Sequence, residues 1–245
     1  MVTFAAPATN ADALGNRLAQ VIRRYSDKAP RSQLSAPGPS ELGEPCVRRM
    51  GYKLLDWPKT NHHSDPWPAI SGTAIHAWLA DAFGEDEGNW LVEQKVQIRH
   101  NLSGTCDLFD ITNGIVIDHK CVGATSMKAR KTKGPTDQQK VQVNLYGLGM
   151  ELAGYTVNKV ALAFYPLGGM LDGLHMWVDD YDRQMALDAI ERLDKITTLV
   201  LALDPETDPT QFANLPAAPS SSCTYCPWFS PGAENAGIGC HGQTE

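Results

Sequence analysis

The residues best suited to chemistry lie on either side of the dipeptide Asn113-Gly114. Asn-Gly favours a tight hairpin turn, so residues 105–109 are expected to fold back beside the strand that follows. Side chains two apart in a strand share a face, which places Asp118 beside Lys120 and brings Asp107 toward both. Two carboxylates can hold a divalent cation and a lysine can act on an adjacent water, as phosphodiester hydrolysis requires. The alternative is structural, because aspartates often cap turns and strand-end lysines are usually solvated.

Two elements upstream of this hairpin supply further candidate ligands. Residues 71–73 are expected to start a helix, and His76 lies on the border of its apolar face. Residues 90–99 alternate as a strand, with Glu93 on the polar side. A lone histidine on a helix is more often a surface residue or a satisfied core residue, but this helix directly precedes the strands that carry the aspartates. We therefore take His76 as a candidate metal ligand and Glu93 as a third acidic candidate.

A helix predicted over about residues 136–153 follows the hairpin. Gln138, Gln142 and Tyr146 recur every four residues along it, so they form a single polar stripe. Polar groups on a fixed helical face can orient a metal-bound water, a phosphate or a base. A stripe that simply faces solvent is the alternative.

A basic tract surrounds Gly134-Pro135, immediately after the central hairpin. A cationic segment next to an acidic metal pocket is a place where a polyanion can bind, although a solvated loop has the same composition. The residues predicted to contact DNA phosphates are Lys128, Arg130, Lys131 and Lys133.

The six cysteines fall into two groups. Cys106 and Cys121 lie in strand segments, where a free cysteine usually acts as a small buried hydrophobic residue. The remaining four are Cys46, Cys223, Cys226 and Cys240. Because two thiolates separated by two residues can grip one ion or one cluster edge, Cys223 and Cys226 indicate a metal site in the irregular tail. Cys46 can supply a fourth thiolate from far upstream.

The segment before the candidate site has a helix and a linker. A helix capped by Thr9 or Asn10 is expected to run to about Ser26. Its apolar residues at amphipathic spacing are Leu14, Leu18, Val21, Ile22 and Tyr25. The Pro- and Ser-rich residues 29–39 form a linker, and a short helix opens at Pro39 or Ser40.

Periodicity also predicts the elements after the candidate site. Strands are expected over residues 157–165 and 173–178, and Asp179 is expected to cap a long helix over about residues 181–203. The order is therefore helix, three strands, helix, one or two strands and helix. This order indicates an α/β fold in which a sheet of mixed direction has helices on its faces.

The overall composition limits the class of protein. A chain of 245 residues can bury a full core, and one domain with appendages is the simplest organisation. Its formal net charge of −7 gives no global positive field to attract nucleic acid, so any DNA contact must be local or metal-mediated. Neither a signal peptide nor a membrane span is recognisable, so we expect a cytoplasmic protein. In that compartment cysteines are expected to bind metal or to be buried rather than to form disulfides.

Five motifs, taken in order, resemble the RecB-like branch of the PD-(D/E)XK nuclease superfamily, which includes CRISPR-associated and helicase-associated iron–sulfur exonucleases. The motifs are His76 in Gly-Thr-Ala-Ile-His, Glu93, Asp107 in Gly-Thr-Cys-Asp, Asp118-His-Lys120, and Gln142-Val-Asn-Leu-Tyr146. The resemblance implies a restriction-endonuclease-like core of helix, three strands, helix and strand over residues 39–245. Residues 204–245 would be its cluster-binding tail, and residues 1–38 an N-terminal helix and linker.

The resemblance also implies roles for the candidate residues. Asp107 and Asp118 would bind Mg²⁺ or Mn²⁺ with the help of His76, and an imidazole ligand suits Mn²⁺ better. Lys120 would orient the attacking water and stabilise the charged transition state. The implied catalytic set is completed by Glu93, Gln142 and Tyr146.

In such relatives one early and three late cysteines bind a [4Fe–4S] cluster. The resemblance therefore implies a cluster on Cys46, Cys223, Cys226 and Cys240 that clasps the N-terminal segment to the tail. Thirteen residues separate Cys226 from Cys240, more than is usual, so His241 is an alternative last ligand and Zn²⁺ an alternative occupant.

Two classes of function follow. The first is a stand-alone DNA exonuclease that acts on single strands or DNA ends in recombination, repair or end processing, in the host cytoplasm if it is phage-encoded. The sequence contains no P-loop motif, so a helicase or recombinase would supply the substrate, and homo-oligomers are compatible with the sequence. The second class is a non-catalytic DNA-binding or assembly subunit, which the acidic net charge disfavours.

Overall fold

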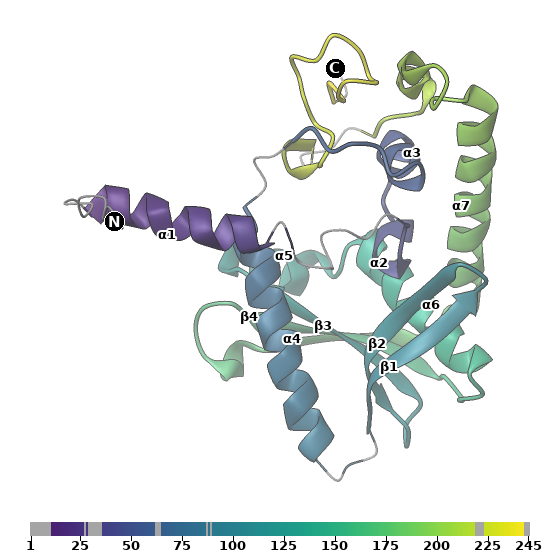
Figure 1. Cartoon of the computed structure of the whole chain (residues 1–245). Coiled ribbons are helices and arrows are strands. Elements are labelled where there is room, and N and C mark those ends of the chain that lie inside the picture. The colour runs from purple at the N-terminus through teal and green to yellow at the C-terminus, as the bar shows by residue number, and fades with distance from the viewer. Residues whose placement is uncertain are drawn as a thin grey trace, which may run out of the picture.

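The computed structural model describes residues 11–26, 28, 36–61, 65–86, 88, 90–218 and 223–242. A five-stranded sheet lies at its centre, with the strands in the spatial order β1-β2-β3-β4-β5 (Figure 1). The strands are β1 (Trp90–Arg99), β2 (Leu102–Asp110), β3 (Ile115–Val122), β4 (Lys159–Pro166) and β5 (His175–Asp180). β3 and β4 run parallel and the other neighbours are antiparallel, which confirms the mixed α/β sheet.

The hairpin that carries the candidate residues forms as the sequence predicts. Its loop spans residues 111–114, and the amide of Gly114 donates to the carbonyl of Asp110 at 2.8 Å. Gly114 has φ +66°, a conformation that glycine adopts without a Cβ penalty. Leu108 pairs with Ile117 across the hairpin, and the carboxylate of Asp107 accepts from the backbone amide of His119 at 2.8 Å.

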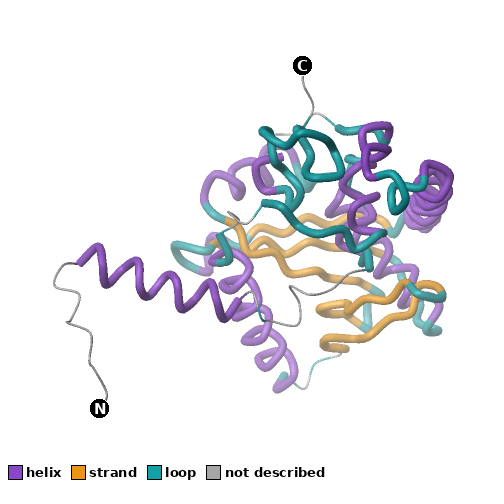
Figure 2. Tube along the Cα trace, turned by 45° about the horizontal axis from the view of Figure 1, so that its top comes forward, coloured by secondary structure: helices purple, strands orange, loops and turns teal. Residues whose placement is uncertain are grey.

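Helices cover the two faces of the sheet (Figure 2). α6 (Asp137–Leu152) contacts β1 to β4 and is itself covered by α7 (Arg183–Leu203). α4 (Trp67–Glu85) contacts β1, β2 and β3. Alternate side chains of β3 point to the two helical layers. Asp118 bonds to Gln142 of α6, whereas His119 stacks on Phe83 of α4. None of the described helices has the length and apolar composition that a membrane crossing needs.

Two apolar cores hold these layers together. The first lies between the sheet and α6, and includes Phe109 and Phe164. The second joins α7 and the tail to α3 (Val47–Leu54), where the ring of Tyr52 stacks on Phe212 at 4.1 Å and on Trp228 at 5.5 Å. The tail itself contains only the short helices η3 (Pro209–Asn214) and η4 (Cys223–Tyr225) among its described residues.

Several predicted boundaries were wrong. α4 begins at Trp67 rather than at Ser71, because Pro68 is compatible with the first turn of a helix. α7 is capped by Asp182, whose carboxylate accepts from the amide of Met185, whereas the expected cap Asp179 belongs to β5. The short helix expected after Pro39 is two helices, α2 (Pro39–Leu42) and α3, and the N-cap of α3 is Cys46.

The basic tract and the N-terminal segment also differ from expectation. Most of the tract forms a helix, α5 (Ala124–Lys133), which the sequence analysis did not predict because only Met127 along it is buried. α1 (Ala11–Ser26) has the predicted extent and apolar stripe, yet none of its residues is buried. The expected cap residues Thr9 and Asn10 lie outside the described residues.

Candidate active site

A cleft with an empty volume of ≈ 1830 Å³ opens between α2, α4 and the sheet. The candidate residues that line it are His76, Glu93, Asp107, Asp118, Lys120, Gln142 and Tyr146. They come from α4, three strands and α6, so the fold brings together groups that are up to 70 positions apart. Gln138, the third member of the polar stripe, instead donates to the carbonyl of Ser40 in α2 at 2.7 Å.

The candidate metal donors lie at the boundary of α4, β1 and β2. His76, Glu93 and Asp107 each offer one ligand atom, and these atoms all lie within 4.8 Å of one another. His76 Nδ1 is 3.5 Å from Asp107 Oδ2, and this hydrogen bond raises the pKa of His76. Burial opposes ionisation of Asp107, but the contact with His76 and the backbone amide of His119 hold its pKa below the ordinary value. The set is therefore preorganised to keep a carboxylate beside an imidazole.

The backbone of Glu93 is unusual. It has φ +49°, in the left-handed region that few non-glycine residues adopt, although Val92 and Gln94 on either side stay paired with β2. Such conformations persist where the surroundings enforce them, and they cluster at functional sites. In this chain the strained residue is one of the three clustered donors.

The second half of the cleft is a buried polar network centred on Asp118, which is 1 % exposed. Asp118 Oδ2 lies 2.6 Å from Lys120 Nζ, but it accepts no well-aligned hydrogen bond within the described chain. Gln142 Nε2 donates to Asp118 Oδ1 at 3.0 Å, while Lys120 Nζ donates to Gln142 Oε1 at 3.1 Å. Burial raises the pKa of Asp118 to about 6, and the ammonium of Lys120 opposes this shift.

Tyr146 completes the network, because its hydroxyl accepts from Gln142 Nε2 at 3.2 Å. Gln142 and Tyr146 are 8 % and 7 % exposed, so their stripe does not face solvent. The four-residue repeat on α6 therefore supports the lysine and the carboxylate of β3.

His119 is a site residue that the sequence analysis did not select. Its ring is 3 % exposed, stacks on Phe83 at 5.7 Å between centroids, and meets His76 edge-on at 6.0 Å. Its Nδ1 lies 3.3 Å from the hydroxyl of Tyr165, and its backbone amide donates to Asp107 at 2.8 Å. Burial lowers the pKa of His119 to about 4, so it is neutral near pH 7. Alternation placed this residue on the other face of β3, but only the packing of α4 reveals its contacts.

The predicted DNA-binding cations are not in the cleft. Lys128, Arg130, Lys131 and Lys133 lie on α5, which packs beside β4, and none of these four residues lines the cleft. The lining contains Lys53 instead, which pairs with Glu41 at 3.6 Å.

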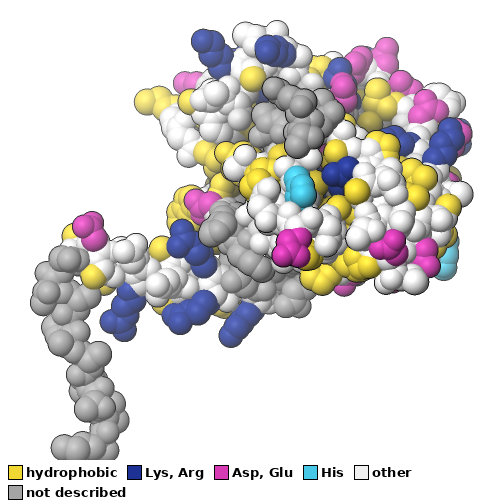
Figure 3. All heavy atoms as spheres, turned by 90° about the horizontal axis from the view of Figure 1, so that it is seen from above, with side chains coloured by type: hydrophobic (Ala, Val, Ile, Leu, Met, Phe, Trp, Pro, Cys, Tyr) yellow, Lys and Arg dark blue, Asp and Glu magenta, His cyan; other side chains and the backbone are white. Residues whose placement is uncertain are grey.

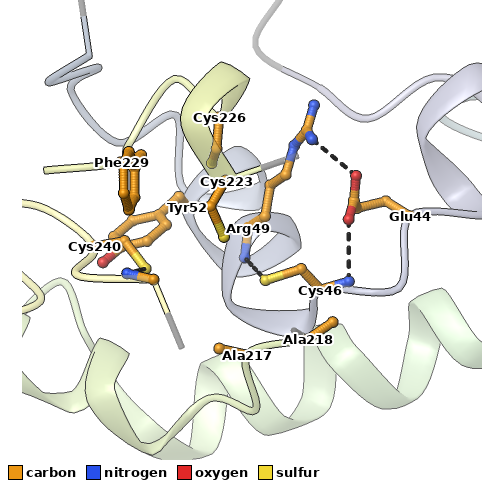
Figure 4. A pocket seen from close by; sticks show the side chains of 11 residues that line it. Glu44, Cys46, Arg49, Tyr52, Ala217, Ala218, Cys223, Cys226, Phe229 and Cys240 are labelled. Atoms are coloured by element: carbon orange, nitrogen blue, oxygen red, sulfur yellow. Dashed lines mark hydrogen bonds and ion pairs between the residues drawn. The ribbon is translucent and has the colours of Figure 1, made fainter. Parts of the chain in front are cut away.

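The four cysteines outside the strands line one separate pocket with an empty volume of ≈ 400 Å³ (Figure 4). Cys46 comes from the N-cap of α3, and Cys223, Cys226 and Cys240 come from the tail. Their sulfurs accept from several donors: the amide of Arg49 to Cys46 at 3.4 Å, the amide of Gly242 to Cys240 at 3.4 Å, and the guanidinium of Arg48 to Cys240 at 3.7 Å.

The spacing of these sulfurs bears on what the pocket can hold. Within the described part of the chain, no cysteine belongs to a group of three ligand atoms that lie within 4.8 Å of one another. Zn–S bonds of about 2.3 Å would place tetrahedral sulfurs about 3.8 Å apart, closer than this. A polynuclear cluster binds each thiolate through a different metal atom and accommodates wider spacing. His241, the alternative last ligand, lines a different pocket.

Both Cys106 and Cys121 remain apart from this pocket. Cys106 is fully buried in β2, as predicted, whereas Cys121 is half-buried and lines the cleft.

The mixed sheet, with acidic residues and a lysine in one cleft, has the arrangement of a nuclease-like fold. The chain belongs to the PD-(D/E)XK nuclease superfamily, whose sequence profile matches residues 6–230. This match includes α1. Searches among curated protein sequences give no match.

One solved structure shares this fold at low sequence identity, and two further structures match with TM-scores below 0.5. The alkaline exonuclease LHK-Exo from Laribacter hongkongensis has a TM-score of 0.51 and 10 % identity, covering 75 % of this chain and 96 % of that chain. The structure of LHK-Exo in complex with dAMP has a TM-score of 0.48 and 11 % identity, covering 70 % of this chain and 90 % of that chain. A phage-related exonuclease from Haemophilus somnus 129PT has a TM-score of 0.46 and 13 % identity, covering 83 % of this chain and 92 % of that chain.

Proposed function

We propose that this chain is a metal-dependent DNA exonuclease that hydrolyses phosphodiester bonds in single strands or at DNA ends. The observation that carries the proposal is the convergence of three clustered donors and a lysine-bound carboxylate in one cleft. Membership of a nuclease superfamily supports the reaction, and the likeness in fold to the alkaline exonuclease LHK-Exo favours attack at ends.

The donor set fits Mg²⁺ or Mn²⁺, because carboxylates suit both ions and the imidazole of His76 favours Mn²⁺. Asp107 and His76 would hold the ion together with Asp118, whose Oδ2 lacks a well-aligned hydrogen bond. Glu93 is close enough to share this task. A bound ion would supply Lewis-acid stabilisation of the phosphate and a more acidic water.

The remaining residues of the cleft would orient the reacting groups and stabilise the charge that develops on the phosphate. Lys120 Nζ, fixed between Asp118 and Gln142, would hold the attacking water and balance the negative charge that develops on the phosphate. Tyr146 keeps the amide of Gln142 in place. The cations of α5 would contact phosphates further along the strand, outside the cleft.

We also propose a [4Fe–4S] cluster on Cys46, Cys223, Cys226 and Cys240. The shared pocket supports it. Brown protein with iron and acid-labile sulfide is expected after anaerobic purification. Colourless protein that contains zinc instead would reverse the assignment.

The test of the nuclease is degradation of end-labelled single-stranded and duplex DNA with Mn²⁺, Mg²⁺ or EDTA. Wild type is expected to shorten DNA only with a divalent ion. Asp118→Asn is expected to lose at least about 100-fold in rate, and the exposed control Asp188→Asn to lose nothing. DNA binding without cleavage by wild type under every metal would favour the non-catalytic subunit.

If the nuclease is confirmed, its place in the cell is the next question. Since the chain has no P-loop, we propose that a helicase or recombinase exposes the DNA ends during recombination or repair. Co-purification with such a partner on DNA is the corresponding test.

A further inference from the structure

The ring of His119 is enclosed by aromatic side chains from two elements. It is 3 % exposed, stacks on Phe83 of α4 with an angle of 13° between the planes, and meets the ring of Tyr165 on β4 edge-on at 5.4 Å between centroids. Its neighbours on this face of the sheet, Ile117 and Ala163, are apolar. An imidazole buried in an apolar layer needs partners for its nitrogens, whereas a leucine or a phenylalanine would need none. Packing alone therefore does not explain a histidine at this position.

The hydroxyl of Tyr165 is one such partner, because it lies 3.3 Å from His119 Nδ1. A neutral imidazole has one nitrogen that donates and one that accepts, and a hydroxyl can do either, so the bond forms with either tautomer. The bond determines which edge of the ring points to β4, and the stack on Phe83 fixes the plane of the ring. The orientation of His119 is thus defined by two independent contacts.

His119 contacts two of the three clustered donors without belonging to the cluster. Its backbone amide donates to Asp107 Oδ2 at 2.8 Å, and its ring meets the ring of His76 at 6.0 Å between centroids and at an angle of 81°. The donor atoms that lie within 4.8 Å of one another come from His76, Glu93 and Asp107. His119 therefore belongs to the layer of residues that borders these donors.

The orientation of His76 depends on contacts of this kind. Its side chain is 27 % exposed, and 3.5 Å between its Nδ1 and Asp107 Oδ2 is long for a hydrogen bond. His76 and Phe83 are seven residues apart, so they lie on the same side of α4, and both meet the ring of His119. The ring of His119 thus supplies a second contact that limits the rotation of His76.

We propose that His119, oriented by Tyr165, positions His76 and thereby sets the preference of the metal site for Mn²⁺ over Mg²⁺. The inference rests on the proposed nuclease site and extends it to residues that do not touch the ion. An imidazole nitrogen is a better ligand for Mn²⁺ than for Mg²⁺, which is bound almost entirely through oxygen. A displaced His76 would therefore lower the affinity for Mn²⁺ and leave the affinity for Mg²⁺ nearly unchanged. A role in packing alone would influence both ions alike.

The first test measures the Mn²⁺ and Mg²⁺ dissociation constants of the full chain by calorimetry, without DNA. Tyr165→Phe removes only the hydroxyl. It is expected to weaken Mn²⁺ binding about 10-fold, as is typical for the loss of a group that orients a metal ligand, and to change Mg²⁺ binding by less than about twofold. Tyr181→Phe is the matched control, because it removes a hydroxyl that donates to Glu151 at 2.8 Å and lies outside the cleft lining. It should leave both constants unchanged.

Acidic side chains elsewhere on the surface also attract divalent ions, so binding in the cleft must be measured separately. Figure 3 shows such groups spread over one face of the molecule. Titrations of Asp107→Asn, which removes a donor carboxylate from the cleft, give this background for both ions. Only the binding that is lost in Asp107→Asn is assigned to the cleft.

The second test asks whether the effect passes through His76. In His76→Ala the preference for Mn²⁺ should be lost, and adding Tyr165→Phe or His119→Phe should change neither constant, because the ligand that they position is gone. In His119→Phe, which keeps a ring against Phe83, Mn²⁺ binding should weaken about as much as in Tyr165→Phe, and the double variant should weaken it no further. Circular dichroism checks the folding of each variant.

Two results would overturn this inference and leave the proposed nuclease intact. The first is an equal change of Mn²⁺ and Mg²⁺ binding in Tyr165→Phe, or no change in either, in a protein that cleaves DNA. The second is a further loss of Mn²⁺ affinity when His119→Phe is added to His76→Ala, which would make His119 a ligand in its own right. A wild type that binds no divalent ion in the cleft and cleaves no DNA would overturn the proposed function as well.

Discussion

The cleft and the cysteine pocket are built in opposite ways. In the cleft, the side chains of Asp118, Lys120 and Gln142 project from a strand and a helix, and they bond to one another. In the cysteine pocket, Cys223 lies in a single turn of 3₁₀ helix, and Cys240 in an isolated bridge to Phe229. Regular elements therefore preorganise the first site, whereas irregular chain surrounds the second.

This difference indicates two ways of stabilising a site. The sheet and α6 would keep the carboxylates in place without a bound ion, at the expense of a buried carboxylate with a raised pKa. The tail has few regular hydrogen bonds and closes around its thiols, so a bound cluster would contribute directly to its folding. Loss of the proposed divalent ion and loss of the proposed cluster should therefore affect different properties of the protein.

The largest effect is expected from disrupting the cysteine pocket. Cys46→Ser should abolish the visible absorption of the cluster and lower stability by more than about 3 kcal/mol, or about 6–12 °C in melting temperature. The reason is that Cys46, at the N-cap of α3, is the one cysteine of the pocket that does not come from the tail. Anaerobic thermal unfolding and limited proteolysis measure the change, and cuts should fall in the tail rather than in the sheet.

Cys121→Ser is the matched control for this variant, because Cys121 lies outside the pocket. It should keep the colour and the melting temperature. If proteolysis after loss of the cluster began in the sheet, the sheet would also depend on the cluster. That result would contradict the conclusion that the two sites are stabilised independently.

The next effect should be purely catalytic. Lys120→Met is expected to reduce DNA hydrolysis by at least about 100-fold, because it removes the one ammonium held between Asp118 and Gln142. The cluster absorption should be unchanged, and manganese binding by calorimetry should persist. Lys53→Met, in the same cleft but paired with Glu41, is a comparison that should lose much less. Equal losses in both variants would indicate a general charge effect rather than a placed donor.

The sequence alone predicted the elements of the cleft well, because their signals are local. Alternation in β3 assigned Asp118 and Lys120 to one face, and Asn113-Gly114 marked the turn that brings Asp107 toward them. The four-residue spacing of Gln142 and Tyr146 likewise defined a stripe on α6. Each of these signals lies within about eight residues, where strand and helix geometry determine the outcome.

What the sequence did not provide depends on packing between distant elements. The role of His119 requires α4 to cover one half of the sheet face, and the strand pattern does not contain that information. The left-handed backbone of Glu93 has no local signal, because glutamate rarely adopts it. The amphipathic spacing of α1 was clear, but periodicity does not say which surface, if any, covers its apolar stripe.

A smaller effect should come from pH, through His119. Its folded-state pKa of about 4 lies below the unfolded value of about 6.5, so the unfolded chain binds the extra proton between these values. Stability in metal-free buffer should therefore be complete above about pH 6.5 and fall as the pH decreases toward 4. His119→Phe, which keeps an aromatic ring against Phe83, should flatten this dependence.

The measurement is the melting temperature of both proteins across that range. His100→Gln, at an exposed turn, should leave the slope unchanged. The same slope in wild type and in His119→Phe would assign the acid sensitivity to other groups.

The smallest effect should come from the backbone of Glu93, and it sharpens the contrast between stability and function within the cleft. Glu93→Gly relieves the left-handed strain, so it should raise stability by about 1 kcal/mol, whereas Glu93→Gln keeps the strain and should change stability little. Both variants remove one carboxylate from the donor cluster, so both should weaken manganese binding to a similar extent. If only Glu93→Gly weakens the binding, then the backbone conformation rather than the carboxylate is what the site requires, and Glu93 would no longer belong to the donor set.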